Sequence, residues 1–255
     1  MYYSVDPNKR FILLDGDRIA TLTATFLGEL VTKSGLAEQI KLGIVQTAYA
    51  NGGSTDYIRK FLKLPVECTA TGVKHLHHAA ARFDIGVYFE ANGHGTVIFS
   101  PNATRTIRDH EPKSPAQLDA LETLKACANL INQAVGDALS DLLLVEVILA
   151  HKGWTCKEWE MCYKDLPNRQ LKVEVVDRTQ FRTTDAERKL ESPRNIQEEI
   201  DKHVMKYSEG RAFARASGTE DVVRVYAEAQ SRSEADELAT RVAEVVARFG
   251  GMGLR

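Results

Sequence analysis

The chain has 255 residues, of which 44% are hydrophobic, 27% charged and 7% aromatic. This balance supports a sizeable core and excludes both a disordered chain and a membrane-embedded one. Lysine and arginine number 33 against 35 acidic residues, for a net charge of −2. We therefore expect no nucleic-acid partner, because such binders usually carry a basic excess.

The chain also lacks targeting and disulfide patterns. Its N-terminus has no basic-then-apolar signal peptide, and its most apolar stretch, 142–150, is interrupted by Glu146 and too short to span a bilayer. The four cysteines have no C-x-x-C spacing, so reduced thiols are expected. These features predict a cytoplasmic protein with no membrane partner.

The first part of the chain alternates predicted strands and helices. Alternating apolar residues over 85–89 and 97–99, on either side of Asn92-Gly93-His94-Gly95, predict a β-hairpin. The other expected elements are a strand over 11–14, a helix with apolar positions from 19 to 30, a strand over 42–50, a polar break over 51–54, and helices over 55–61 and 71–82.

The next segment carries loop and capping signals. Residues 101–113 contain proline, threonine and charged residues, and a connecting loop is expected there. Serine-proline and threonine-glutamate pairs then predict helix starts. The expected helices run from Ser114-Pro115 to Val135, from 137 to 150, and onward from a Thr155 and Glu158 capping box.

From about residue 165 the pattern becomes strand, helix, strand, strand, helix. This is the layout of a small α+β domain whose helices cover one face of an antiparallel sheet. The expected strands are 171–175, 212–215 and 222–228, and the expected helices begin at Ser192-Pro193 and at a Ser233 cap. The fold class predicted from these patterns is α/β followed by α+β, with a domain boundary near residue 165.

A glycine turn between two arginines predicts a phosphate site. The turn follows Arg215, is centred on Gly218 and precedes Arg224. Its backbone N–H groups can bind an anion, Ser217 and Thr219 add hydroxyl donors, and the arginines add charge. The alternative is an ordinary hairpin turn with solvated arginines, and composition alone leaves both open.

The predicted hairpin tip at 89–95 carries Glu90, Asn92 and His94. A carboxylate, an amide and an imidazole this close together can hydrogen-bond several sugar hydroxyls at once. The alternative is a polar turn with a chance histidine. The sequence of the loop, taken alone, slightly favours this alternative over a sugar site.

Lys74 follows a glycine turn and precedes three histidines. The lysine could act as a phosphate partner or a general acid or base, and a solvated lysine at a helix start is the alternative. Only His75 and His78 would share a helix face, and no carboxylate or cysteine lies at a matching interval. We therefore expect no metal site among the histidines.

Two carboxylates, Asp15 and Asp17, resemble a magnesium loop. The alternative is an N-cap, in which Asp17 satisfies the free N–H groups at the start of a helix.

Taken in order, these motifs resemble the C-terminal half of the phosphoacetylglucosamine mutases of the α-D-phosphohexomutase superfamily. The matching stretches are I-V-Q-T-A-Y-A-N-G, C-T-A-T-G-V-K-H-L-H-H, F-D-I-G-V-Y-F-E-A-N-G-H-G, D-L-P-N-R-Q-L-K-V and S-G-T-E-D-V-V-R-V-Y-A-E-A. The asparagine of the E-A-N-G-H loop indicates the acetylglucosamine branch, since glucose and mannose relatives usually carry serine there.

The resemblance implies three parts: a remnant of domain II over 1–38, a mixed-sheet sugar-recognition domain III over 39–164, and an antiparallel-sheet phosphate-binding domain IV over 165–255. It implies that Lys74 lies near the reacting oxygens. The implied sugar contacts are Glu90, Asn92 and His94, and the implied phosphate contacts are Arg215, Ser217, Gly218, Thr219 and Arg224.

The chain departs from the family pattern at three points. The serine-His-Asn-Pro phosphoserine motif is absent, Asp15-Gly16-Asp17-Arg18 lacks the third aspartate of the magnesium loop, and Ala216 stands where proline is usual. We therefore reject Asp15 and Asp17 as ligands and expect no metal residues in this chain, although the family enzymes use Mg²⁺.

The resemblance implies interconversion of N-acetylglucosamine 6-phosphate and 1-phosphate on the way to UDP-N-acetylglucosamine. This chain would be a truncated, catalytically incomplete part of such an enzyme, and the N-terminal domains that it lacks would be a partner. The alternative is a non-catalytic module or subunit that binds a sugar phosphate.

Overall fold

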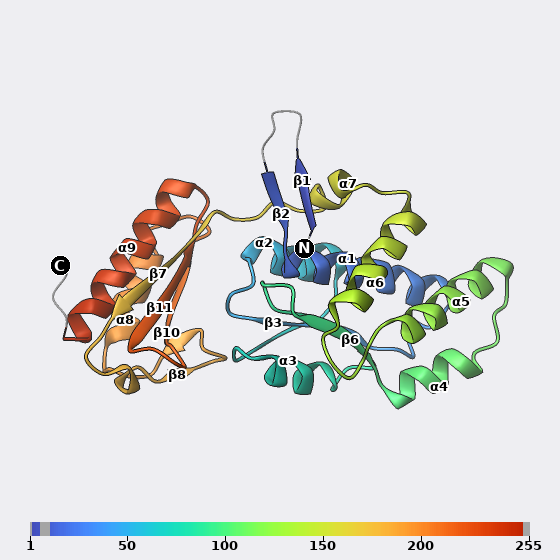
Figure 1. The fold of residues 1–255 in the computed structure, drawn as a ribbon, viewed down its shortest axis with the longest axis horizontal. Coiled ribbons are helices and arrows are strands. Elements are labelled where there is room, and N and C mark those ends of the chain that lie inside the picture. The colour runs from blue at the N-terminus through green and yellow to red at the C-terminus, as the bar shows by residue number, and fades with distance from the viewer. Residues whose placement is uncertain (1, 6–10, 252–255) are drawn as a thin grey trace. The chain divides into compact units, whose positions relative to one another are not determined.

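The computed structural model describes residues 2–5 and 11–251, which form two compact units (Figure 1). One unit holds Met1–Cys68 and Gly72–Lys164, and the other holds Thr69–Thr71 and Asp165–Arg255. Each has its own hydrophobic core. Within the described residues, no helix has the length and apolar character needed to cross a membrane.

The first unit is built on a mixed four-stranded sheet, in the order β4-β3-β5-β6. Strands β3 and β5 are parallel, whereas β5 and β6 form an antiparallel hairpin. A separate hairpin, β1 with β2, precedes the sheet. The bounds are β1 (Tyr2–Val5), β2 (Phe11–Leu14), β3 (Leu42–Thr47), β4 (Val66–Thr69), β5 (Ile85–Phe89) and β6 (Gly95–Phe99).

Helices cover both faces of this sheet. Ile44 and Val87 share the larger core with apolar residues of α1, α5 and α6, whereas Val45 and Tyr88 pack with α3 on the other face. This layering makes the unit α/β. The helices are α1 (Gly16–Lys33), α2 (Gly52–Asp56), the π-helical turn η1 (Tyr57–Leu62), α3 (Val73–Ala80), α4 (Pro101–Asp109), α5 (Pro115–Leu130), α6 (Ala138–Lys152) and α7 (Cys156–Glu160).

The second unit is a three-stranded antiparallel sheet, in the order β10-β11-β7, with α8 and α9 packed on one face. The core side chains include Val223, Val225, Ile200 and Leu238. The elements are β7 (Asn168–Glu174), the short helix η2 (Arg178–Gln180), β8 (Thr183–Thr184), β9 (Lys189–Leu190), α8 (Ile196–Val204), β10 (Arg211–Ala216), β11 (Val222–Glu228) and α9 (Arg232–Phe249). The predicted fold class, α/β followed by α+β, is confirmed.

Several local predictions for the first unit are wrong. Residues 101–113 are not a loop throughout, because Ser100 caps α4, Pro101 begins it, and Ala103 and Ile107 form its buried side. The polar break at 51–54 is a helix start, since Asn51 Oδ1 accepts from Gly53 N at 2.9 Å. The helix that begins at Pro115 ends at Leu130 instead of reaching Val135.

The second unit also differs from prediction at two helix starts. Ser192-Pro193 does not open a helix, because α8 begins at Ile196, after Asn195 in a left-handed conformation. The cap of α9 is Ser231, not Ser233, and it forms a capping box with Glu234. Both signals therefore lie within three residues of the true starts.

Candidate functional site

Three cations lie side by side on the sheet of the second unit. Arg215 of β10 is directly opposite Arg224 of β11, which is directly opposite Lys172 of β7. Paired residues in antiparallel strands project from the same face, so the three form a basic row. Like charges in such positions repel one another and destabilise a sheet. An anion binding across the row would offset that repulsion.

Two carboxylates partly neutralise the basic row. Glu220 lies 3.7 Å from Arg224 Nη2 and 3.1 Å from Lys172 Nζ, while Glu187 Oε1 lies 3.5 Å from Arg215 Nη1. In the same unit, Thr71 N and Oγ1 donate to Glu187 Oε2 at 2.9 and 2.5 Å. These contacts hold an anionic oxygen beside Arg215, where a ligand oxygen could take its place.

Glu187 belongs to a strained turn. Asp185, Ala186 and Glu187 have φ values of 52°, 55° and 66°, a left-handed run without glycine. Each such residue costs free energy and persists only when its surroundings enforce it, which is commonest at functional sites. The strain thus marks the turn that presents Glu187 to Arg215.

The predicted phosphate turn joins β10 to β11. The Ser217 hydroxyl is buried and accepts from the backbone N–H groups of Thr219 and Glu220, both at 3.4 Å. At Gly218 an added Cβ would have no atom within 4 Å, so the space above the turn is open. Within the described residues, Gly218 is not among the glycines with positive φ. The turn therefore does not require glycine for its backbone conformation, but it leaves room for a ligand.

The predicted sugar loop is the tip of the β5–β6 hairpin. Glu90 N donates to His94 O and Gly93 N donates to Glu90 O, both at 2.8 Å, and Asn92 Oδ1 accepts from His94 N at 2.8 Å. His94 Nδ1 lies 3.9 Å from Glu90 Oε2. The loop therefore holds Glu90, Asn92 and His94 close together.

Two glycines from other elements support this loop. Gly16, the first residue of α1, donates its N–H to Ala91 O at 3.2 Å, and a Cβ on Gly16 would lie only 1.8 Å from Glu90 O. A Cβ on Gly136 would lie 2.4 Å from His94 Cδ2. Only glycine allows these close approaches, so the sequence before α6 and the start of α1 both position the loop.

Lys74 lies in the first turn of α3, after Gly72 with a φ of 126°. One helical turn further on, His77 Nδ1 lies 3.2 Å from Tyr88 Oη, and Tyr88 is the penultimate residue of β5. The start of α3 thus lies at the edge of the sheet where β5 ends and the sugar loop begins. Lys74 is exposed there, so its ammonium group is accessible to a ligand.

The two N-terminal aspartates have structural contacts. Asp15, and not Asp17, caps α1, because Asp15 Oδ1 accepts from Arg18 N at 3.2 Å. Asp17 is buried and its Oδ2 accepts from Asn51 N at 2.7 Å. Among residues 2–5 and 11–251, no group of three His, Cys, Asp or Glu side chains could hold a metal ion.

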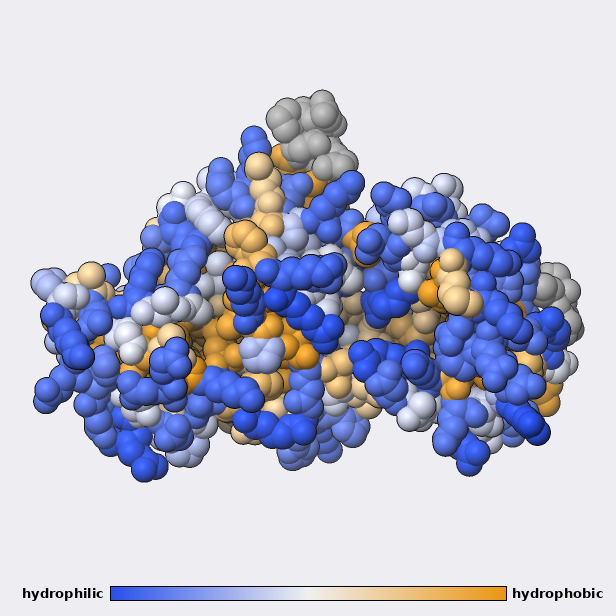
Figure 2. Space-filling model, turned by 180° about the vertical axis from the view of Figure 1, so that it is seen from behind, coloured by the Kyte–Doolittle hydropathy of each residue, from blue (hydrophilic) through white to orange (hydrophobic). Residues whose placement is uncertain are grey.

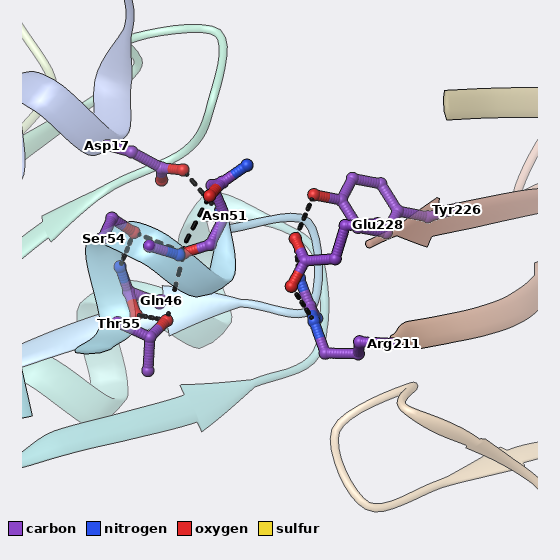
Figure 3. A network of polar contacts seen from close by, with 9 residues as sticks. Asp17, Gln46, Asn51, Ser54, Thr55, Arg211, Tyr226 and Glu228 are labelled. Carbon is purple, nitrogen blue, oxygen red and sulfur yellow. Dashed lines mark hydrogen bonds and ion pairs between the residues drawn. The ribbon is translucent and has the colours of Figure 1, made fainter. Parts of the chain in front are cut away.

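Figure 3 shows the network that begins at Asp17. Gln46 Nε2 donates to Ser54 Oγ at 3.0 Å, and Thr55 Oγ1 donates to Gln46 Oε1 at 2.8 Å. Ser54 Oγ donates in turn to Asn51 O at 2.8 Å. These buried bonds fix the turn that follows β3. Because parallel strands end at the same edge, this turn and the sugar loop share one edge of the sheet.

Figure 3 also shows polar contacts on the basic-row face of the second unit. The Glu228 carboxylate is buried and accepts from Arg211 Nε and Tyr226 Oη, both at 2.7 Å. Tyr226 stacks on Phe213 with ring centroids 5.3 Å apart. Arg211, Phe213 and Arg215 alternate on β10, as Arg224, Tyr226 and Glu228 do on β11, so this face is polar and aromatic while the other carries the core.

The site also includes residues that no sequence motif indicated. The sequence places Lys172 only in a predicted strand, because its position beside Arg224 depends on strand register. Glu187 is separated from Arg215 by 28 positions, and nothing in its local pattern points to an arginine. Gly16 and Gly136 were likewise missed, since only tertiary contacts show why a Cβ would not fit.

Comparison with known proteins gives matches over most of the chain. Residues 15–154 match the family model for phosphoacetylglucosamine mutase AMG1, domain III, and residues 171–245 match that for the phosphoglucomutase/phosphomannomutase C-terminal domain. Phosphoacetylglucosamine mutase 2 of Schizosaccharomyces pombe is 56% identical over 92% of this chain and 43% of its own length. The human phosphoacetylglucosamine mutase is 53% identical over 100% of this chain and 47% of its own length.

Solved structures give the same result. Aspergillus fumigatus N-acetylphosphoglucosamine mutase in complex with GlcNAc-6P and magnesium superposes with a TM-score of 0.96 at 65% identity, over 98% of this chain and 46% of that one. An N-acetylglucosamine-phosphate mutase in its substrate complex superposes with a TM-score of 0.92 at 51% identity, over 96% of this chain and 46% of that one. The chain thus spans less than half the length of these relatives.

Proposed function

The chain belongs to the phosphoacetylglucosamine mutase family, and we propose that it forms the sugar-recognition and phosphate-binding parts of an enzyme acting on N-acetylglucosamine phosphates. The reaction is the interconversion of the 6-phosphate and the 1-phosphate. The observation that carries the proposal is the row of Arg215, Arg224 and Lys172 beside an open turn.

In this proposal the basic row and its turn bind the phosphate that is not being transferred. Arg215 and Arg224 donate charge-assisted hydrogen bonds to its oxygens, and Lys172 contributes further positive charge. Ser217, Gly218 and Thr219 line the open side of the turn. The phosphate displaces Glu187 from Arg215, which replaces one anionic oxygen by another.

The sugar loop recognises the hexose. Glu90 accepts hydrogen bonds from hydroxyl groups, and His94 donates or accepts according to its tautomer. The Asn92 amide is the proposed partner of the acetamido group. Lys74 extends from the start of α3 toward the reacting oxygens, where an ammonium group stabilises negative charge on a transferring phosphoryl group.

Magnesium, present in the related Aspergillus fumigatus complex, does not fit the described residues of this chain. Asp15 caps a helix, Asp17 holds a backbone N–H, and no group of three metal-ligating side chains occurs in the described ranges. The family's phosphoserine motif is also absent from the sequence. The second candidate is a module that binds the sugar phosphate without converting it.

The two candidates differ in turnover. We expect no conversion of N-acetylglucosamine 6-phosphate by the purified chain with magnesium and a hexose bisphosphate, because no residue here replaces the phosphoserine nucleophile. Conversion that is abolished by Lys74→Ala would instead establish catalysis within these 255 residues.

The remaining assignments are also proposals. They are the division into a domain II remnant over 1–38, a domain III over 39–164 and a domain IV over 165–255, a cytoplasmic location, and the N-terminal domains of the family as a partner. Co-purification of this chain with separately expressed N-terminal domains of a relative would test that last assignment.

Calorimetry tests the phosphate site. Each charge-assisted contact contributes about 1.5–3 kcal/mol, so Arg215→Ala should weaken binding of N-acetylglucosamine 6-phosphate about ten- to a hundredfold. The unphosphorylated sugar should bind equally to both proteins. Arg241→Ala is the matched control, because Arg241 is half exposed on α9 and pairs with Glu237 and Glu244. If Arg215→Ala binds the phosphorylated sugar as well as wild type, the phosphate assignment is wrong.

A further inference from the structure

A cavity of about 370 Å³ lies in the first unit, behind the sugar loop. It is bounded by the end of β2, the first turn of α1, sugar-loop residues 91–93, and the start of α6. Its apolar walls include Leu14, Ile19 and Leu142. Cavities of this volume hold small organic molecules.

Asp141 of α6 lines this cavity and has no partner there. The residue is only 7% exposed, and its Oδ1 is buried without a hydrogen bond. Burial, together with the nearby charge of Asp137, raises the pKa of Asp141 to about 7. Buried carboxyls are normally paired or hydrogen-bonded, and one that is not destabilises the folded protein.

Among the described residues that line the cavity, the charged side chains are all acidic. Its other ionisable wall residue is Asp15, whose carboxylate caps α1. Among the described wall residues, none is lysine, arginine or histidine. A ligand that offsets this charge must therefore bring its own cation, and the apolar walls favour a hydrocarbon stem behind it.

We propose that this cavity is a second ligand site, which binds a small molecule bearing a primary ammonium group on a short apolar stem. The ammonium group pairs with Asp141, and the stem packs against Leu14, Ile19 and Leu142. The site shares Asn92 with the proposed sugar contacts, but Asp141, its proposed charged partner, is not one of those contacts.

Benzylamine is the probe, and benzyl alcohol is its neutral counterpart of the same shape. Titrations at pH 8, where the Asp141 carboxyl is mostly ionised, are followed by calorimetry and by NMR of the uniformly ¹⁵N-labelled chain. We expect benzylamine to bind wild type at least tenfold more tightly than benzyl alcohol does. The amide signals of 91–93 and of the first turn of α6 should shift.

Two variants and one control test whether benzylamine binds in this cavity. Asp141→Asn should remove the preference for benzylamine, and Ala138→Phe should exclude both probes by filling the cavity. Ala150→Phe, on the exposed side of the same helix, should bind benzylamine as wild type does. The proposal would be overturned if benzylamine did not bind to wild type. It would also be overturned if Asp141→Asn kept the wild-type preference for benzylamine over benzyl alcohol, or if Ala138→Phe bound the probes as wild type does.

Discussion

Replacing Asp141 by asparagine should stabilise the first unit at high pH and not at low pH. The folded-state pKa of Asp141 is about 7, against an ordinary value of 3.8. Between these values the unfolded chain releases the proton while the folded chain keeps it, so stability falls as pH rises from about 4 to 7. The difference in pKa sets an upper limit of about 4 kcal/mol on this loss. Asparagine has nearly the same shape and does not ionise.

Urea unfolding at pH 4, 6 and 8 measures the effect. Both tryptophans, Trp154 and Trp159, lie in the first unit, so their fluorescence reports on that unit alone. Asp141→Asn should match wild type at pH 4 and exceed its free energy of unfolding by up to about 4 kcal/mol at pH 8. Asp119→Asn, an exposed change on α5, is the control. A stability difference that is the same at pH 4 and pH 8 would refute the reasoning.

Three further substitutions test the support and chemistry of the proposed sites. Gly16→Ala should destabilise the first unit by about 1–3 kcal/mol and weaken sugar binding, because its Cβ would meet the sugar-loop backbone at 1.8 Å; Gly28→Ala in the same helix, with only ordinary contacts at 3.6 Å and beyond, should be neutral or stabilising in the same denaturation assay. Asn92→Ser should reduce the affinity ratio of N-acetylglucosamine 6-phosphate over glucose 6-phosphate in calorimetry, and an unchanged ratio would count against the amide's role. Glu187→Gln should tighten inorganic phosphate binding about three- to tenfold by removing a charge that competes for Arg215, whereas weaker binding would mean that Glu187 positions the arginine.

Local patterns predicted the elements that local chemistry specifies. The β5–β6 hairpin and the Thr155 capping box follow from residues next to one another in sequence, and both are confirmed. The α4 helix was missed because charged and threonine side chains outweighed the Ser100-Pro101 start signal, although Ala103 and Ile107 are its buried residues.

The candidate site was predictable in its motifs and not in its surroundings. Glu90, Asn92 and His94 are close in sequence, so a hairpin alone gathers them. The basic row cannot be predicted without the pairing register of the strands, because Lys172 and Arg224 are adjacent only through the pairing of β7 with β11. The Asp141 cavity brings together the start of α1, a hairpin tip and the start of α6, which no sequence spacing reveals.

Hydrophilic residues cover most of the face shown in Figure 2, and an apolar area lies within the first unit. The apolar residues of α6 show why the buried side of a helix can be hard to predict from sequence. On α6, Leu139 and Leu143 are exposed whereas Leu144 and Ile148 are buried. The continuous apolar run in this helix gave no periodicity from which the buried side could be predicted.

The most direct test of sugar-phosphate binding is an NMR titration of the ¹⁵N-labelled chain with N-acetylglucosamine 6-phosphate. The proposed function predicts shifted amide signals both at 215–224 and at 90–95. With unphosphorylated N-acetylglucosamine, only the 90–95 signals should shift. Phosphorylated sugar that leaves the signals of 215–224 unmoved at saturating concentration would contradict the account.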